Sequence, residues 1–180
     1  MLGEMMAPEN VSRIEMRDAE EADVPALTAI KGDGTEVLHR DRLRDAQGIG
    51  FRYLVLLAGG EIIGFACLVI RRPAYWSDAN DTHHLPQIVD LQVKEAQRGQ
   101  GYGSDFVRAM ERIASEAGYR QLYMSVEPLN NPRAYALYQR LGYQQEQSEP
   151  CQKTWEFQDS EGKLHRGEDW VVDMVKQLHV

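Results

Sequence analysis

A run of glycines between a buried strand and an amphipathic helix is the feature that most restricts the fold. The stretch QRGQGYGSDF, residues 97–106, follows the apolar run IVDLQV. Glycine tolerates positive φ and lets another group approach the backbone more closely than a Cβ permits. A strand that continues through such a turn into a helix presents backbone N–H groups at the positive end of the helix dipole. The turn predicts a phosphate site, and a glycine-rich connection that binds nothing is the alternative.

Two better-known phosphate loops do not fit this spacing. The turn lacks the Gly-Lys-Ser/Thr ending of a Walker A loop, and Gly99, Gly101 and Gly103 do not follow the dinucleotide fingerprint G-x-G-x-x-G. The formal net charge of -8 argues against non-specific binding to nucleic acid, which depends on Lys and Arg. An anionic ligand must therefore be held locally, by backbone amides at the turn.

Hydrophobic periodicity predicts strands and helices in a mixed α/β order. Asp23 is the expected cap of the first helix and Asn131 that of the last, with Gly118 and Gly142 as left-handed helix ends. We expect strands near 14–16, 51–58, 62–70, 88–93, 121–126, 153–157 and 169–175, helices over 24–30, 35–46, 104–118 and 132–141, a long loop over 71–86, and a polar turn over 158–168.

The chain length fits one domain over residues 1–180, with 1–11 as a flexible N-terminus. No apolar run approaches the roughly 18 residues that span a bilayer, and the first ten residues do not resemble a signal peptide. We therefore expect a cytoplasmic protein without a membrane partner. Cys67 and Cys151 are expected to be free thiols, and the histidine spacing predicts no metal site.

Beyond the turn, the sequence resembles the GNAT N-acetyltransferase superfamily. The stretch Arg98-Gly99-Gln100-Gly101-Tyr102-Gly103 matches the family's loop Gln/Arg-x-x-Gly-x-Gly/Ala, and Leu91-Gln92-Val93 matches the Leu-x-Val that precedes it. Farther along, Asn131, Ala134 and Tyr138 match the pattern Asn-x-x-Ala-x-x-x-Tyr, and Leu141-Gly142-Tyr143 matches the following Leu-Gly-Phe/Tyr. The resemblance is strong over 88–143.

This resemblance implies a central, mostly antiparallel mixed sheet of about seven strands flanked by four helices. It also implies an acyltransferase that moves the acetyl group of acetyl-CoA to a primary amine of a small molecule or protein, by direct attack in a ternary complex. A CoA-binding regulatory or sensor module of the same fold, without transfer activity, is the alternative. From a different class, a nucleotide-binding protein with an unrelated α/β fold would also explain a glycine turn.

The resemblance assigns cofactor contacts residue by residue. The pantetheine arm would pair with the backbone of the strand segment Leu91, Gln92 and Val93. The pyrophosphate would lie against the turn, made of Arg98, Gly99, Gln100, Gly101, Tyr102, Gly103 and Ser104. The later helix would contribute Asn131, Ala134 and Tyr138. Because one extra residue precedes the asparagine, Asn130 competes with Asn131 for the cofactor contact.

The reaction implied by the family requires two proton transfers. A primary amine is about 0.1% neutral at pH 7, so a base or a water relay must accept its proton. Asp90 is the favoured base and Glu127 its rival, and either could be a solvated carboxylate. Tyr138 matches the family's general acid, which protonates the departing thiolate. His83 and His84 in the long loop are weaker candidates for the base.

The sequence does not identify the amine acceptor. Specificity in the family comes from segments that correspond here to 31–50 and 71–86, and neither carries a recognisable motif. The acidic balance mildly favours a cationic acceptor such as a polyamine, an amino sugar or a protein amino group. A homodimer through the C-terminal strands is compatible with the family.

Overall fold

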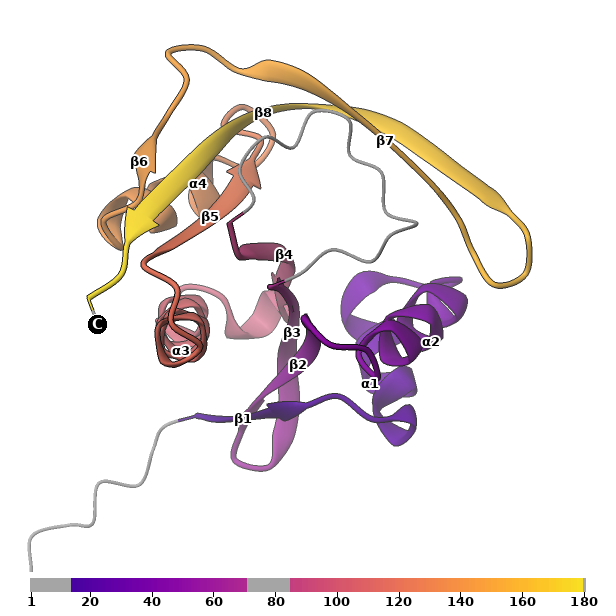
Figure 1. The fold of residues 1–180 in the computed structure, drawn as a ribbon. Coiled ribbons are helices and arrows are strands. Elements are labelled where there is room, and N and C mark those ends of the chain that lie inside the picture. Colours follow the sequence, from indigo (N-terminus) through magenta and orange to yellow (C-terminus); the bar gives the residue numbers. More distant parts are fainter. Residues whose placement is uncertain (1–13, 71–84, 180) are drawn as a thin grey trace, which may run out of the picture.

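The computed structural model describes residues 14–70 and 85–179. Its centre is a mixed sheet of eight strands in the order β1-β2-β3-β4-β5-β8-β6, with β7 paired to β8 (Figure 1). Among the described strands, β4 and β5 alone pair in parallel, which agrees with the predicted, mostly antiparallel sheet. The strands are β1 (Glu15–Asp18), β2 (Phe51–Ala58), β3 (Glu61–Val69), β4 (Gln87–Val93), β5 (Gln121–Val126), β6 (Gln144–Gln145), β7 (Cys151–Gln158) and β8 (Leu164–Gln177).

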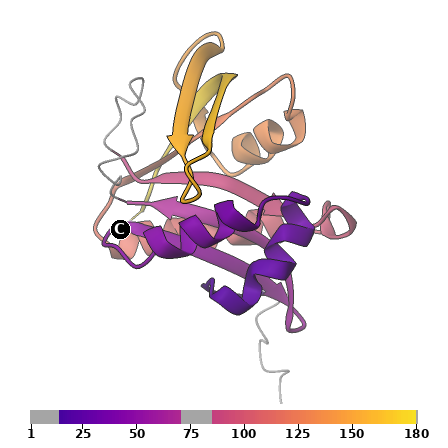
Figure 2. The same ribbon diagram turned by 90° about the vertical axis from the view of Figure 1, so that its right-hand side faces the viewer.

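Four α-helices flank the sheet in the described part of the chain, in agreement with the prediction. They are α1 (Val24–Lys31), α2 (Glu36–Asp45), α3 (Tyr102–Glu116) and α4 (Pro132–Arg140). Short 3₁₀ turns precede α1 (Glu21–Asp23) and α3 (Glu95–Gln97). Helices α1 and α2 lie on one side of strands β1–β4, and α3 lies on the other (Figures 1 and 2). Within residues 14–70 and 85–179, no helix has both the length and the hydropathy of a membrane-spanning segment.

The unbroken apolar run of β2 follows from this two-sided cover. Leu54 and Leu56 pack in the core that β2 shares with α3, whereas Tyr53 and Val55 pack on the opposite side with Leu27 of α1. Successive strand residues point to opposite faces, so a strand covered on both faces needs apolar residues at nearly every position. Strand β2 is therefore the centre of both cores.

Three of the four predicted helix boundaries have the expected chemistry. The Asn131 side chain accepts a hydrogen bond from the Ala134 N–H at 3.3 Å, and Gly118 and Gly142 both have φ of +89°. The predicted cap at Asp23 is wrong. Its carboxylate makes no capping bond to α1 and instead accepts hydrogen bonds from Arg17 at 2.6 and 2.8 Å and from the Glu20 N–H at 2.9 Å.

The predicted polar turn over 158–168 is also wrong, because most of it is strand. The connection between β7 and β8 spans only 159–163, and Leu164–Val171 pair with β7 before the same strand continues along β5. Most charged residues of this stretch are exposed on a projecting hairpin, so the sequence lacks the apolar alternation of a half-buried strand. The hairpin tip contacts α2, where the Ser160 N–H donates to Asp41 Oδ2 at 3.0 Å.

Several predictions fall outside the described residues. The flexible N-terminus over 1–11 does so, as does nearly all of the loop over 71–86, including His83 and His84. Both cysteines are free thiols, as predicted, and Cys67 is buried.

Candidate active site

Strands β4 and β5 diverge, and the site lies in the space between them. Within the described residues their register contains one pair, Gln87 with Tyr123, next to a backbone bond from the Tyr123 N–H to the Pro86 carbonyl at 3.0 Å. Beyond that pair a cavity of about 690 Å³ separates the strands. Residues 87–92 of β4 form one wall, the end of β5 forms another, and α4 and β8 complete the lining. We call this cavity the cleft.

The three predicted catalytic residues all line the cleft, although they come from separate elements. Asp90 belongs to β4, Glu127 follows β5, and Tyr138 lies in α4. Tyr138 is 7% exposed, and burial raises its pKa to about 12. At neutral pH its hydroxyl therefore keeps its proton and can donate it into the cleft.

The predicted cofactor residues fall into two groups. Five of those outside the catalytic set line the cleft itself: Leu91, Gln92, Arg98, Asn131 and Ala134. The others are Val93 at the end of β4, residues 99–101 in the turn, and residues 102–104 in the first turn of α3. The Arg98 Nε donates to the Val93 carbonyl at 2.9 Å, so this exposed residue joins the strand end to the turn.

The glycine turn has the backbone geometry that its sequence suggests. Gly99 and Gly101 have φ of +81° and +90°, in the left-handed region that L-residues rarely adopt. Gly103 lies in the first turn of α3, where an added Cβ would lie 3.4 Å from Leu137 Cδ2 of α4. The turn therefore brings the N-terminus of α3, whose first N–H groups lack acceptors within the helix, close to α4.

The two asparagines before α4 have different partners. Asn130 Nδ2 donates to Glu127 Oε2 at 2.5 Å, whereas Asn131 caps α4 and lines the cleft. Of the two, Asn131 is thus placed to contact a molecule in the cleft, and Asn130 orients the Glu127 carboxylate.

Comparison with protein families gives a match to the acetyltransferase (GNAT) family over residues 14–143. This match covers more than half of the chain and includes β1, the glycine turn and α4. The chain belongs to the GNAT family. GNAT proteins are acetyltransferases that use acetyl-CoA, so the family and the cofactor predicted from the glycine motif are both confirmed.

Solved structures with similar folds agree with this assignment. A ribosomal-protein-alanine N-acetyltransferase from Brucella melitensis is 23% identical with a TM-score of 0.64, covering 91% of this chain and 99% of that one. YncA from Salmonella typhimurium, solved with its cofactor acetyl-CoA, is 20% identical with a TM-score of 0.62, covering 93% and 95%. A phosphinothricin acetyltransferase from Sinorhizobium meliloti, in complex with AcCoA, is 21% identical with a TM-score of 0.64, covering 92% and 89%. The comparison with curated proteins gave no match.

Asp90 lies at an irregularity of this GNAT sheet. Phe65 pairs with Gln92 and Cys67 with Val89, so one residue of β3 faces two residues of β4, which is a β-bulge. Asp90 has φ of +51° and is the one non-glycine residue with positive φ in the described part of the chain. Such a conformation costs on the order of 1–3 kcal/mol and persists only where its surroundings hold it.

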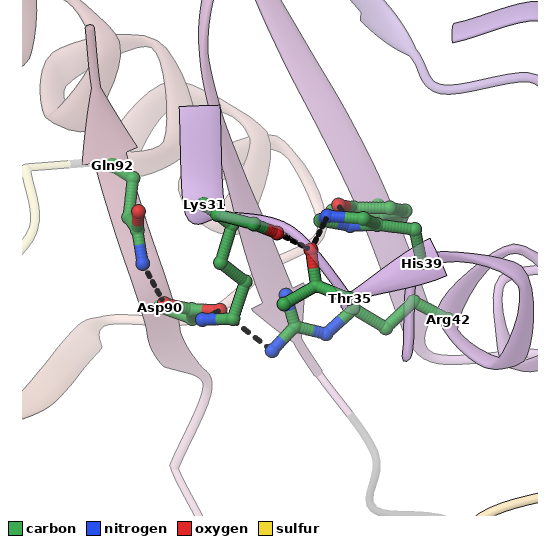
Figure 3. Close-up of polar contacts among 8 residues, drawn as sticks. Lys31, Thr35, His39, Arg42, Asp90 and Gln92 are labelled. Carbon is green, nitrogen blue, oxygen red and sulfur yellow. Dashed lines mark hydrogen bonds and ion pairs between the residues drawn. The ribbon is translucent and has the colours of Figure 1, made fainter. Parts of the chain in front are cut away.

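Two cations and an amide hold the Asp90 side chain (Figure 3). Lys31 Nζ and Arg42 Nη2 each lie 2.7 Å from Oδ2, and Gln92 Nε2 donates to Oδ1 at 2.8 Å. Burial alone would raise the pKa of Asp90, but Arg42 and Lys31 outweigh burial and lower it. A carboxylate with a lowered pKa accepts a proton less readily, so this cluster weakens Asp90 as a base and strengthens it as a fixed anion.

Sequence reasoning missed the partners that shape this site. Lys31 and Arg42 come from α1 and α2, about 50 residues before β4, and no motif links them to Asp90. Arg133 lines the cleft next to Asn131 and lies on the side of Gly99, whose added Cβ would be 3.9 Å from its Nη2. Its position between a helix-capping asparagine and a matched alanine was the only available signal.

A second buried ion pair supports the far wall of the cleft. Asp173 of β8 accepts from Lys153 Nζ at 2.8 and 2.9 Å and from Ser125 Oγ at 2.5 Å, and Ser125 lines the cleft. Asp173 is 3% exposed, and although burial by itself would raise its pKa, the bonds from Lys153 and Ser125 lower it. This cluster fixes β5, β7 and β8 where β8 passes from one partner strand to the other.

His39 lies behind the Asp90 cluster and is fully buried. The Thr35 hydroxyl donates to the Gly32 carbonyl at 2.7 Å, so it accepts from His39 Nε2 at 3.2 Å, and Nδ1 accepts from the Tyr53 hydroxyl at 2.7 Å. Burial, followed by the nearby charges of Arg42 and Lys31, lowers the pKa of His39 to about 4. This imidazole is therefore neutral in the folded protein.

We expect His39 to make the protein less stable in mild acid. The unfolded chain protonates His39 near its usual pKa of 6.5 and the folded protein only near 4, so its stability contribution is complete above pH 6.5 and falls toward pH 4. Between about pH 7 and pH 5 this residue should remove about 2 kcal/mol from the free energy of unfolding. Urea unfolding of the wild type and His39→Gln at both pH values measures it. If the free energy of unfolding falls equally with pH in the two proteins, His39 is not the residue responsible.

Proposed function

We propose that the protein transfers the acetyl group of acetyl-CoA to a primary amine by direct attack in a ternary complex. The observation that carries this proposal is the convergence of Tyr138, Glu127 and Asp90 on one cleft, between two strands that have separated. In a purely structural sheet, such a gap would leave backbone groups and polar side chains without partners.

The groups that line the cleft and the glycine turn suit acetyl-CoA. The edge of β4 that faces the gap presents backbone groups of Leu91 and Gln92 that β5 does not pair, and these can bind the amides of a pantetheine arm. The glycine turn and the start of α3 supply N–H groups for the pyrophosphate, with Arg133 as a cation beside Gly99. Bound acetyl-CoA supplies the thioester that serves as the acetyl donor.

Tyr138 is the proposed acid. The amine nitrogen forms a bond to the acetyl carbon as the carbon–sulfur bond breaks, and the sulfur leaves with the electron pair. Because the hydroxyl of Tyr138 stays protonated at neutral pH, it can give its proton to this sulfur. The buried ring also excludes water from the reacting atoms.

Glu127 is the proposed base. It lines the cleft, its carboxylate is oriented by Asn130, and no lysine or arginine in the described part of the chain forms an ion pair with it, whereas Lys31 and Arg42 both pair with Asp90. Since a carboxylate held by two cations is a poor proton acceptor, the proton of the attacking amine passes to Glu127, directly or through water. Asp90 then serves as the fixed anion that positions β4.

The first test is a calorimetric titration with acetyl-CoA, using NADH and ATP as controls. We expect micromolar binding of acetyl-CoA alone. Ala134→Glu should weaken it at least about a hundredfold, because a carboxylate would enter the cleft near the expected anion. Ala136→Glu is the matched control, since this residue of α4 lies outside the cleft lining. The affinity of this variant for acetyl-CoA should equal that of the wild type. If Ala134→Glu binds acetyl-CoA as tightly as the wild type does, the proposed placement of the cofactor is wrong.

Tyr138→Phe should lower kcat about a hundredfold or more while the affinity for acetyl-CoA stays within about twofold. The substitution removes the proton donor but keeps the ring in the core. Tyr135→Phe in the same helix removes a hydroxyl that donates to Gln145 at 2.7 Å, outside the cleft, and should leave kcat unchanged. Steady-state release of CoA reports both. An unchanged kcat in Tyr138→Phe would exclude it as the acid.

Glu127→Gln should lower kcat/KM about tenfold to a hundredfold at neutral pH. The loss should shrink as the pH approaches the pKa of the free acceptor amine. The reason is that the amine then sheds its proton to solvent without help. The measurement is the pH profile of kcat/KM for the wild type, Glu127→Gln and Asp90→Asn. If Asp90→Asn, and not Glu127→Gln, shows a loss of kcat/KM that shrinks at high pH, Asp90 is the base.

A further inference from the structure

A second cavity lies on the other side of β4 from the cleft. It encloses about 310 Å³ between α2, the sheet and the tip of the β7–β8 hairpin. Val89 lines both cavities, and Arg42 lines this one while pairing with Asp90 in the cleft. Figure 2 shows the hairpin reaching down over the side of the sheet that α1 and α2 cover. We call this cavity the α2 pocket.

The surface that the α2 pocket offers a ligand is mainly apolar. Its walls include Leu38 of α2, Phe51 of β2, Cys67 of β3, Val89 of β4 and Phe157 of β7. Burial raises the pKa of the Cys67 thiol to about 11, so this side chain is neutral at physiological pH. Phe157 stacks on His165 with a centroid distance of 4.9 Å, which holds its ring in place.

Several charged side chains around the α2 pocket are paired with one another, although Arg42 Nη1 and Asp41 Oδ1 are buried without a hydrogen-bond partner among the described residues. Arg42 pairs with Asp90 at 2.7 Å and Arg44 with Asp41 at 3.1 Å. At the hairpin tip, Asp159 pairs with His165 at 2.7 Å. A ligand that brought its own charge deep into this pocket would have to break such a pair or lose hydration without compensation. The pairs therefore select against highly charged ligands.

We propose that the acceptor is a small primary amine on a compact apolar body, such as an aromatic ring or a branched aliphatic group, and that this body occupies the α2 pocket. The inference rests on the proposed function. The volume lies at the low end for ligand pockets and fits one ring better than an amino sugar. A polyamine would bury a second ammonium group, and those hydroxyls of an amino sugar that face the apolar walls at Leu38, Val89 and Phe157 would lose hydration without a partner there.

The shared position of Val89 explains how such an acceptor could meet the donor. The apolar body of the acceptor would lie against one side of β4, at Val89. Its amine would then lie near the bulge at Asp90, a residue that lines the cleft on the other side of the strand. The Asp90 cluster is then the wall between the two sites, and its ion pairs keep Lys31 and Arg42 from repelling an approaching ammonium group at full strength.

The experiment compares amines of different polarity in a CoA-release assay. The apolar probes are 2-phenylethylamine and isopentylamine, and the polar probes are spermidine, kanamycin and a short peptide with an N-terminal alanine. We expect kcat/KM for the apolar amines to exceed that for each polar amine by about tenfold or more. Acetyl-CoA affinity is measured in parallel by calorimetry.

Leu38→Glu places a charge in the wall of the α2 pocket from a half-buried helix position. It should raise KM for 2-phenylethylamine about tenfold or more and leave the acetyl-CoA affinity unchanged. Ile49→Glu is the matched control, because Ile49 follows α2 but is 93% exposed and lies outside the pocket. Phe157→Ala, on the exposed hairpin, is a second variant that removes apolar wall without adding charge and should raise KM about fivefold.

The outcomes separate the two levels of the proposal. Turnover confined to spermidine, kanamycin or the peptide, or equal KM values in Leu38→Glu, Phe157→Ala and Ile49→Glu, would overturn this inference and leave the acetyltransferase intact. Acetyl-CoA binding without turnover of any amine would overturn the proposed function and this inference with it.

Discussion

The separation of β4 from β5 is the constraint on which the rest of the molecule depends. A strand inside a sheet normally satisfies its backbone groups on both edges, and β4 does so along β3 but meets β5 at one position. The opened edge creates the cleft. Because the strands are parallel at their single pair, the chain must cross over between them, and the crossing segment is the glycine turn followed by α3. The opened edge and the anion-binding turn are thus adjacent for a topological reason.

Holding such a gap open requires support from both sides. On the α1 and α2 side, Lys31 and Arg42 pair with Asp90 and stabilise the left-handed backbone of the β4 bulge. On the other side, Lys153 and Ser125 bind the buried Asp173, which fixes β5 to β8 and to the base of the hairpin. Breaking a buried pair by removing one partner is strongly destabilising, so each cluster holds its strands in fixed positions. The cleft is in this way largely formed before any ligand arrives.

Much of the site was predictable from local patterns, and the errors have physical causes. The glycine turn, the Asn131 cap and Tyr138 were identified because each depends on backbone conformation or helix spacing within a few residues. The Asp23 cap was wrong because Arg17, on the preceding strand, competes for the same carboxylate. The long turn after β7 was wrong because a hairpin that projects from the sheet has no apolar face to reveal it. Asp90 was correctly placed in the cleft, but the sequence showed neither of the cations that lower its pKa.

The family, the cofactor motif and the order of strands and helices, apart from the two-residue strand β6, could be read from the sequence, because these follow from residue spacing along a short stretch of chain. The side chains that share the cleft, the carboxylate that is held by cations and the asparagine that lines the cleft became known from the three-dimensional structure. That structure alone also revealed the α2 pocket, whose walls come from α2, β2, β3, β4 and β7. These features depend on contacts between residues far apart in the chain, and pairwise electrostatics and burial at such contacts have no signature in local sequence.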